Sequence, residues 1–389
     1  DHVGGGFHRY ATNRDWSVPH FEKMLYDNAE LPRVYLAGYQ ATAVETYAET
    51  VRETLSFLER ELSHPEGGFY STLDAQSPDE DGNRAEGAFY TWTPDQVRDA
   101  VGDDLAADLF RDRFGVTERG NVDGSSALAV RRGMESLAEE YDLDPADAES
   151  NVDAAREALF AAREDRPRPA RDEKVLAGWN GLAISAFSEA GIVLDPEYAE
   201  RASEALGFVD RTLRDGSDLK RRYEDGVVGV DGYLEDYAFL ARGALDCYGA
   251  TGDVDALAVA LDLARGIESE FWDESEAALY FTPASGEELI ARPQELTDQS
   301  TPSSAGVAID VLLALDHFVP HDRFAEIAES ALTTYRSRVE SSPLQHTTLA
   351  LAADRYANGS RELTVVAEDL PEAWREQIAG TYLPKRLLS

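Results

Sequence analysis

The sequence predicts an all-α protein, an (α/α) toroid in which an inner ring of apolar helices is surrounded by an outer ring of amphipathic helices. Two observations carry this prediction. The first is a repeat of apolar helix, amphipathic helix and short extended segment, with a period of roughly 50 to 70 residues. The second is that helices apolar on most sides belong in an interior, whereas helices with one apolar stripe cover it. The extended segments predict short β-hairpins between helices.

The second half of the chain contains three copies of this repeat. Apolar helices are expected to begin near Trp179, Tyr233 and Ser303. Their amphipathic partners are expected at 198–213, 254–271 and 323–339, with short extended pieces at 219–223 and 279–281.

The first half is less regular. Residues 45–62 carry a helical apolar stripe that ends at Gly67 and Gly68. Residues 68–92 predict a β-hairpin in which a strand at 69–74 pairs with a strand at 87–92. Residues 94–171 are interpreted as an acidic helical insertion or linker. With these two features included, residues 1–389 form one toroid domain.

The stretch near the start predicts a helix that lines a polar pocket. Ser17 is placed as its N-cap and Pro19 in its first turn, where a missing N–H does no harm. On such a helix His20, Lys23 and Asp27 share one stripe, at i, i+3 and i+7.

The charge balance excludes several classes of partner. The chain has 36 basic and 75 acidic residues, a net charge of −39 and a pI near 4.4. Such a protein repels nucleic acid and anionic membrane surfaces, and no apolar run is long enough for a membrane span. Concentrated salt screens this self-repulsion, so we expect a cytoplasmic protein of a halophile.

The sequence predicts no metal site and no cofactor. The single cysteine, Cys247, excludes an internal disulfide and a thiolate cluster. The histidines include no His-Glu-x-x-His, and the triple glycine at 4–6 lacks the lysine and serine of a phosphate loop.

Several motifs resemble the YyaL-like family, whose animal members are called spermatogenesis-associated protein 20. The resemblance is carried by Gly-Gly-Gly-Phe-His-Arg-Tyr at 4–10, by Val-Pro-His-Phe-Glu-Lys-Met-Leu-Tyr-Asp-Asn at 18–28, and by blocks at 74–75, 86–93, 174–182 and 234–240. It implies a thioredoxin-like domain followed by a six-hairpin glycosidase-like toroid. We therefore expect a fragment that begins after the thioredoxin-like domain and the first toroid helices and stops early, which leaves an incomplete ring.

Two departures from the family pattern weaken a glycosidase role. Where the family tends to carry Glu-Pro-Ser-Gly-Asn-Ser, this chain has Thr-Pro-Ser-Ser-Ala-Gly at 301–306. Gln76 likewise stands where an acid is common.

The candidate site residues are those that acid–base chemistry on a sugar needs. Imidazoles and carboxylates can move protons, aromatic faces can stack on a pyranose, and amides and guanidinium groups can bond hydroxyls. The candidate catalytic residues are His20, His8, Glu235, Asp236, Asp74 and Glu86. The candidate substrate-binding residues are Arg9, Trp16, Asp27, Asn28, Trp92, Trp179, Asn180 and Tyr237.

Structural alternatives stand beside these roles. His20 can cap a loop, Glu235 and Asp236 can complement a helix dipole, Trp179 can be a core residue, and Asp27 can pair with Lys23.

The functional hypothesis is a carbohydrate-binding or carbohydrate-processing toroid, with isomerase- or epimerase-like proton transfer favoured. The alternatives are a non-catalytic scaffold or client-binding partner of the thioredoxin-like domain, and a glycosidase-like hydrolase.

Overall fold

A computed structural model describes residues 1–79, 81–287, 289–366 and 370–389. The chain divides into two compact units, and each is built from segments far apart in the sequence. Unit 1 comprises Asp1–Met24 and Thr72–Asp172, and unit 2 comprises Leu25–Ser71 and Glu173–Ser389.

Unit 2 contains the repeated helix pairs. Its helices are α1 (Leu25–Thr42), α2 (Glu45–Phe57, continued by a π-helical turn at Leu58–Leu62), α7 (Ala177–Val193), α8 (Glu197–Leu213), α9 (Leu234–Thr251), α10 (Val254–Phe271), α11 (Ser304–Leu315), α12 (Phe324–Ser341), α13 (Thr347–Asn358) and α14 (Glu372–Ala379). Its strands are β8 (Val175–Leu176), β9 (Arg214–Asp215), β10 (Asp218–Glu224), β11 (Val227–Asp231), β12 (Trp272–Asp273), β13 (Ala278–Leu279), β14 (Arg361–Leu363) and β15 (Arg386–Leu388).

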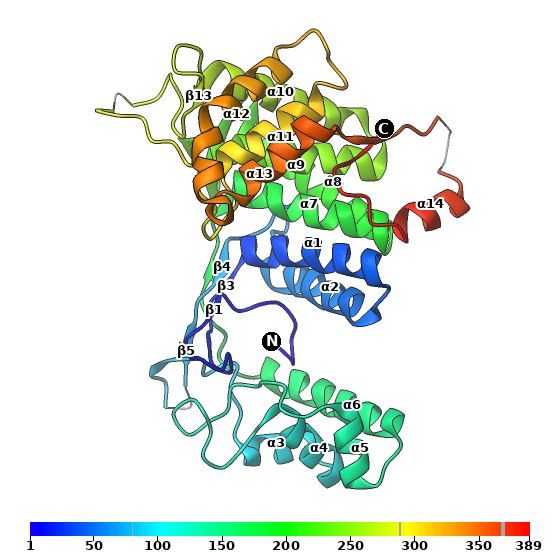
Figure 1. Cartoon of the computed structure of the whole chain (residues 1–389). Coiled ribbons are helices and arrows are strands. Elements are labelled where there is room, and N and C mark those ends of the chain that lie inside the picture. Colours follow the sequence, from blue (N-terminus) through cyan, green and yellow to red (C-terminus); the bar gives the residue numbers. More distant parts are fainter. Residues whose placement is uncertain (80, 288, 367–369) are drawn as a thin grey trace. The chain divides into compact units, whose positions relative to one another are not determined.

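These helices form two layers. In the inner layer α1, α7, α9, α11 and α13 each contact the next, and α2, α8, α10 and α12 pack on their outer side (Figure 1). The inner helices α7, α9 and α11 are buried on most sides, whereas α8 and α10 bury one stripe. The predicted (α/α) toroid fold is confirmed, and hairpins such as β10–β11 and β12–β13 lie between the helices.

The backbones of α7 and α9 touch, and glycine makes this possible. A Cβ on Gly181 would lie 2.5 Å from the backbone nitrogen of Leu240, and one on Gly243 would lie 2.5 Å from the carbonyl oxygen of Gly181. Both distances are far below van der Waals contact, so the spacing of the two inner helices depends on these two glycines.

Unit 1 combines short strands with a small helical core. Its strands are β1 (Tyr10–Ala11), β2 (Pro19–His20), β3 (Lys23–Met24), β4 (Thr72–Leu73), β5 (Gln76–Pro78), β6 (Arg84–Glu86) and β7 (Arg171–Asp172). Its helices are α3 (Pro94–Val101), α4 (Asp104–Phe114), α5 (Met134–Tyr141) and α6 (Pro145–Glu164), which enclose a core that includes Val97, Phe110, Leu137 and Leu159.

The predicted helix from Ser17 through Asp27 is wrong. His20 lies in β2, opposite Tyr10, and Lys23 lies in β3, opposite Leu73; α1 begins only at Leu25. One reason is local, because a residue before proline is pushed toward extended backbone. The other is that Ser17 Oγ bonds to Asn13 and Asp15 instead of capping a helix. The proposed stripe of His20, Lys23 and Asp27 therefore does not form.

The strand pairing at 68–92 also differs from the expected pattern. The hairpin consists of β5 and β6, joined in antiparallel register by pairs such as Gln76 with Glu86. Strand β4 pairs instead with β3 and β7.

Within the described residues, no helix combines the length and apolar character that crossing a bilayer requires.

The glycine contact between α7 and α9 predicts a large stability loss on adding one methyl group. Gly181→Ala should lower the free energy of unfolding by at least about 2 kcal/mol, because backbone atoms must move apart. Gly207→Ala is the matched control, since its Cβ would meet only the end of the flexible Arg211 side chain, 3.1 Å away. The control should be neutral or stabilising by up to about 1 kcal/mol. Equal denaturation midpoints for the two variants would contradict this account.

Candidate functional site

A cavity of about 170 Å³ lies in unit 1. It is lined by Asp1, His2, His8, Trp16, Ser17, Pro19, Phe21, Tyr90, Ala127 and Leu128. Five of the ten lining residues carry an aromatic ring, and polar atoms make up most of the surface of the cavity. Two of the predicted site residues, His8 and Trp16, are among the lining residues.

His8 is held as a neutral imidazole with a defined tautomer. Its Nδ1 lies 3.0 Å from the carbonyl oxygen of Phe21, and because a carbonyl only accepts, we assign the ring proton to Nδ1. The ring packs edge-on against Phe21 and Tyr90, at centroid distances of 5.3 and 4.7 Å. Burial, and then the positive charges of Lys23 and Arg163, lower the pKa of His8 well below 6.5. Nε2 therefore keeps its lone pair at neutral pH, as a proton acceptor requires.

His20 sits between two carboxylates. Its Nδ1 lies 2.8 Å from Glu86 Oε1, and its Nε2 lies 3.6 Å from Glu22 Oε2. The ring stacks on Tyr10 at a centroid distance of 5.0 Å, as the pairing of β1 with β2 dictates. Arg9 joins the cluster through a 3.3 Å bond to Glu22. Among the predicted residues, the structure thus brings His20, Glu86 and Arg9 together, and it adds Glu22.

Trp16 has a strained backbone and an exposed side chain. Its φ of 57° lies in the left-handed region, which costs a bulky residue on the order of 1–3 kcal/mol. The side chain is 83% exposed although the residue lines the cavity, so the indole lies at the rim.

The turn around Trp16 is held by Asn13. The Asn13 side-chain oxygen accepts from the backbone N–H groups of Ser17 and Val18, at 3.1 and 3.0 Å, and its amide donates to Ser17 Oγ. Thr12 closes the turn with two further bonds to the carbonyl of Val18.

The other candidates in unit 1 have local partners. Asp74 bonds Arg84 at 2.5 Å and accepts from the backbone of Gln76. Trp92 is 1% exposed and packs in the core, with the guanidinium of Arg166 3.7 Å from the ring centroid. Because its indole face is covered, Trp92 does not offer a stacking surface.

In unit 2, the candidates on α1 and α7 lie at or near the first turn of an inner helix. Asp27 is half-buried and Asn28 fully buried on α1. Asn180 is fully buried and clamps an extended segment, accepting from the N–H of Phe69 at 2.8 Å and donating to its carbonyl at 3.0 Å. Trp179 is half-buried against Tyr26, edge to face at 4.9 Å. Asn180 thus has a structural role of its own.

Asp236 ties three elements together. Its carboxylate accepts from the N–H groups of Gly178 on α7 and Tyr233 at the start of α9, at 3.1 and 2.9 Å. Arg221 from β10 donates to both Asp236 and Glu235, at 2.8 and 2.5 Å. Burial raises the pKa of Asp236 to about 6, although Arg221 opposes the shift.

Sequence reasoning missed Arg221. The available signal was a run of three cations, Lys220 to Arg222, in a very acidic chain; the run lies in β10, in the hairpin that precedes the inner helix α9.

Tyr237 also serves the fold. Its hydroxyl accepts from the N–H of Leu219 at 3.0 Å, and burial raises its pKa to about 12.

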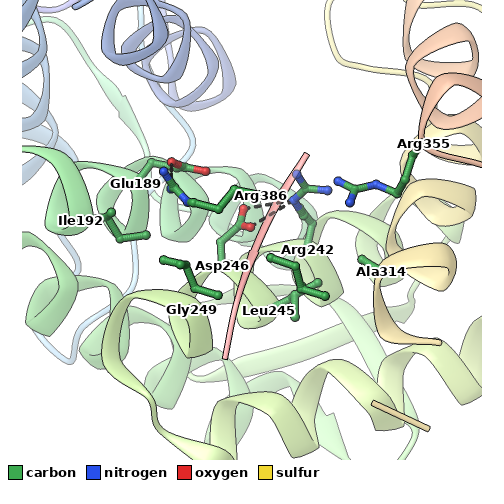
Figure 2. Close-up of a pocket in the computed structure, with 11 residues that line it drawn as sticks. Glu189, Ile192, Arg242, Leu245, Asp246, Gly249, Ala314, Arg355 and Arg386 are labelled. Carbon is green, nitrogen blue, oxygen red and sulfur yellow. Dashed lines mark hydrogen bonds and ion pairs between the residues drawn. The ribbon is translucent and has the colours of Figure 1, made fainter. Parts of the chain in front are cut away.

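A second, smaller cavity of about 30 Å³ lies in the C-terminal halves of the inner helices of unit 2. Figure 2 shows Arg242 and Arg355 reaching toward each other, and Arg386 of β15 reaching toward Glu189, which it bonds at 2.8 Å. Both Arg242 and Arg355 bond Asp310. Burial alone would raise the pKa of Asp310, but these two charges hold it below its usual value. Sequence reasoning missed this network, although a charged residue such as Asp310 within an apolar helix was a readable signal.

Within the ranges that the structure describes, no three His, Cys, Asp or Glu side chains are grouped as metal ligands.

Comparison with known proteins gives a relative that matches along the whole chain. No family model matches. Spermatogenesis-associated protein 20 of Homo sapiens is 33% identical over 422 aligned positions, which cover 100% of this chain and 54% of the human protein. The chain is a relative of spermatogenesis-associated protein 20. It spans about half the length of that relative.

Solved structures show the same fold. A sugar epimerase from a ruminal bacterium has a TM-score of 0.53 at 11% identity, over 86% of this chain and 66% of the epimerase. Cellobiose 2-epimerase from Bacillus thermoamylovorans has a TM-score of 0.52 at 11% identity, over 87% of this chain and 66% of the enzyme. At this identity the likeness concerns the fold.

The buried carboxyl of Asp236 predicts a distinct pH dependence. The folded-state pKa near 6 lies above the ordinary value of 3.8, so the folded protein holds this proton more tightly than the unfolded chain. The stability that this group contributes is therefore fully present below about pH 4 and is lost as pH rises toward 6. Denaturation curves at several pH values give the free energy of unfolding of the wild type and of Asp236→Asn. The difference between the two, wild type minus variant, should fall across this window by an amount on the order of 1–3 kcal/mol. Parallel pH profiles of the two proteins would refute the shift.

Proposed function

We propose that this protein binds a carbohydrate or similar polyol and transfers a proton on its open-chain form, as an isomerase or epimerase does. The observation that carries the proposal is His8, a neutral imidazole whose Nδ1 is bonded to a backbone carbonyl and whose ring lines a cavity of about 170 Å³. Nε2 is then the nitrogen left for a ligand. A half-buried neutral base beside aromatic side chains suits removal of a weakly acidic C–H proton.

The proposed reaction balances with four proton transfers. In the first half, His8 Nε2 accepts the proton from the carbon next to the open-chain carbonyl, and solvent water gives a proton to the carbonyl oxygen, which yields the enediol. In the second half, one proton returns to carbon and one enediol hydroxyl gives its proton back to water. Delivery of the proton by His20 to the same carbon from the other face, with loss of the proton on the former carbonyl oxygen, gives the epimer. Return of the proton from His8 to the former carbonyl carbon, with loss of the neighbouring hydroxyl proton, gives the isomer, and the two imidazoles regain their starting protonation from water. His20, fixed by Glu86 and Glu22, is the proposed second proton carrier.

Hydrolysis has less support in the described residues. A glycosidase needs two carboxyl groups free to act as acid and base or nucleophile. Asp236 is occupied by Arg221 and two backbone N–H groups, and Glu235 bonds the same guanidinium. The similarity of this fold to that of two sugar epimerases further favours proton transfer over hydrolysis.

The competing proposal is a scaffold that presents a client or a thioredoxin-like domain of the full-length protein. Such a domain, a halophilic source and a cytoplasmic location stay predictions of the sequence.

The test is deuterium exchange into sugars. The full-length protein is incubated in D₂O with a panel of aldoses and ketoses, and deuterium at the carbon next to the carbonyl is measured by NMR. His8→Gln should lower the exchange rate at least about a hundredfold, because it removes the proton acceptor. His20→Gln should lower it too.

His321→Gln is the control, since His321 is exposed and lies outside the cavity lining. Exchange that persists in His8→Gln would contradict the mechanism. A wild-type protein that neither exchanges nor binds any sugar would favour the scaffold.

A further inference from the structure

The cavity in unit 1 is too small for an extended ligand. Pockets that enclose drug-sized molecules measure about 300–1,000 Å³, whereas this one measures about 170 Å³. It has room for one sugar unit. Any second unit of the same molecule would project through the mouth of the cavity.

Trp16 stands at that mouth. It contributes to the lining of the cavity and is nevertheless 83% exposed, so part of the indole faces solvent. A single exposed aromatic residue on a protein surface would need no explanation. Trp16 differs because its backbone is held in the left-handed region, at a φ of 57°, where a bulky residue is a genuine outlier.

The rest of the turn maintains this conformation. Asn13 bonds the backbone of Ser17 and Val18 and the hydroxyl of Ser17, and Ser17 is itself buried. The turn is therefore fixed on both sides of Trp16, and the indole is presented on a rigid support. Backbone strain held by surrounding bonds is a recurrent feature of ligand clamps.

We infer that the site takes a sugar of two linked units, with the reducing-end unit in the cavity and the second ring stacked on the indole of Trp16. This inference rests on the proposed function and names its substrate class. Asp15, exposed and 3.8 Å from a guanidinium nitrogen of Arg131, is the neighbouring polar group for the hydroxyls of the second ring.

The experiment compares binding of D-glucose and D-mannose with binding of the 1,4-linked disaccharides cellobiose and mannobiose. Titration calorimetry with the full-length protein should show the disaccharide bound about tenfold more tightly than its reducing-end monosaccharide, because of the additional ring contact. Trp16→Gly should bring this ratio to about one. Glycine adopts the left-handed conformation readily, so the turn keeps its shape.

Two further variants separate stacking from general effects. Trp374→Ala removes another exposed tryptophan, on α14 of unit 2, and should leave the ratio at its wild-type value. Asn13→Ala loosens the support of Trp16 and should lower the ratio without abolishing monosaccharide binding.

The outcomes distinguish this inference from the proposed function. If the monosaccharide binds through His8 but the disaccharide binds no better, the two-unit ligand is wrong and the proposed function stands. A ratio that persists in Trp16→Gly overturns the stacking role. If neither kind of sugar binds, both proposals fall together.

Discussion

The cost of burying charge is the constraint on which both units depend. In a chain with 75 acidic and 36 basic residues, a carboxylate that enters the interior needs a cation or several N–H groups to replace water. Arginine meets this need in unit 2. Arg221 holds Asp236, and Arg242 with Arg355 holds Asp310. The two carboxylates lie on the neighbouring inner helices α9 and α11, so these arginines stabilise the packing of the helical layer as well as the buried charges.

His8 meets the same constraint by remaining uncharged. The cations near its cavity, Lys23 and Arg163, oppose a further positive charge, and burial opposes it more strongly. Burying a neutral imidazole costs little free energy if one of its nitrogens is hydrogen-bonded, and Nδ1 of His8 donates to the carbonyl of Phe21. The physical requirement of the interior thus leaves a proton acceptor beside a cavity. The chemistry proposed for this protein follows from that arrangement.

Helix periodicity and apolar content predicted much of the fold, and residue type alone predicted much less of the site. The apolar helix beginning near Trp179 and the amphipathic helix at 254–271 follow directly from local patterns, and α10 has those bounds. The stripe of His20 and Lys23 failed because distant strands pair with these residues, which local spacing does not encode. Asn180 was a reasonable sugar ligand by type, but its partners are the backbone groups of Phe69, over a hundred positions away.

The most direct test of the account is the protonation state of His8. Nitrogen-15 NMR of the imidazole side chains in the full-length protein, with His8→Gln used for assignment, reports which ring nitrogen carries a proton at each pH. We predict a neutral ring protonated at Nδ1 at pH 6.5, where an ordinary imidazole is half protonated, and at every higher pH. A ring that titrates near 6.5, or one with the proton on Nε2, would contradict the assignment of His8 as a neutral base and with it the proposed chemistry.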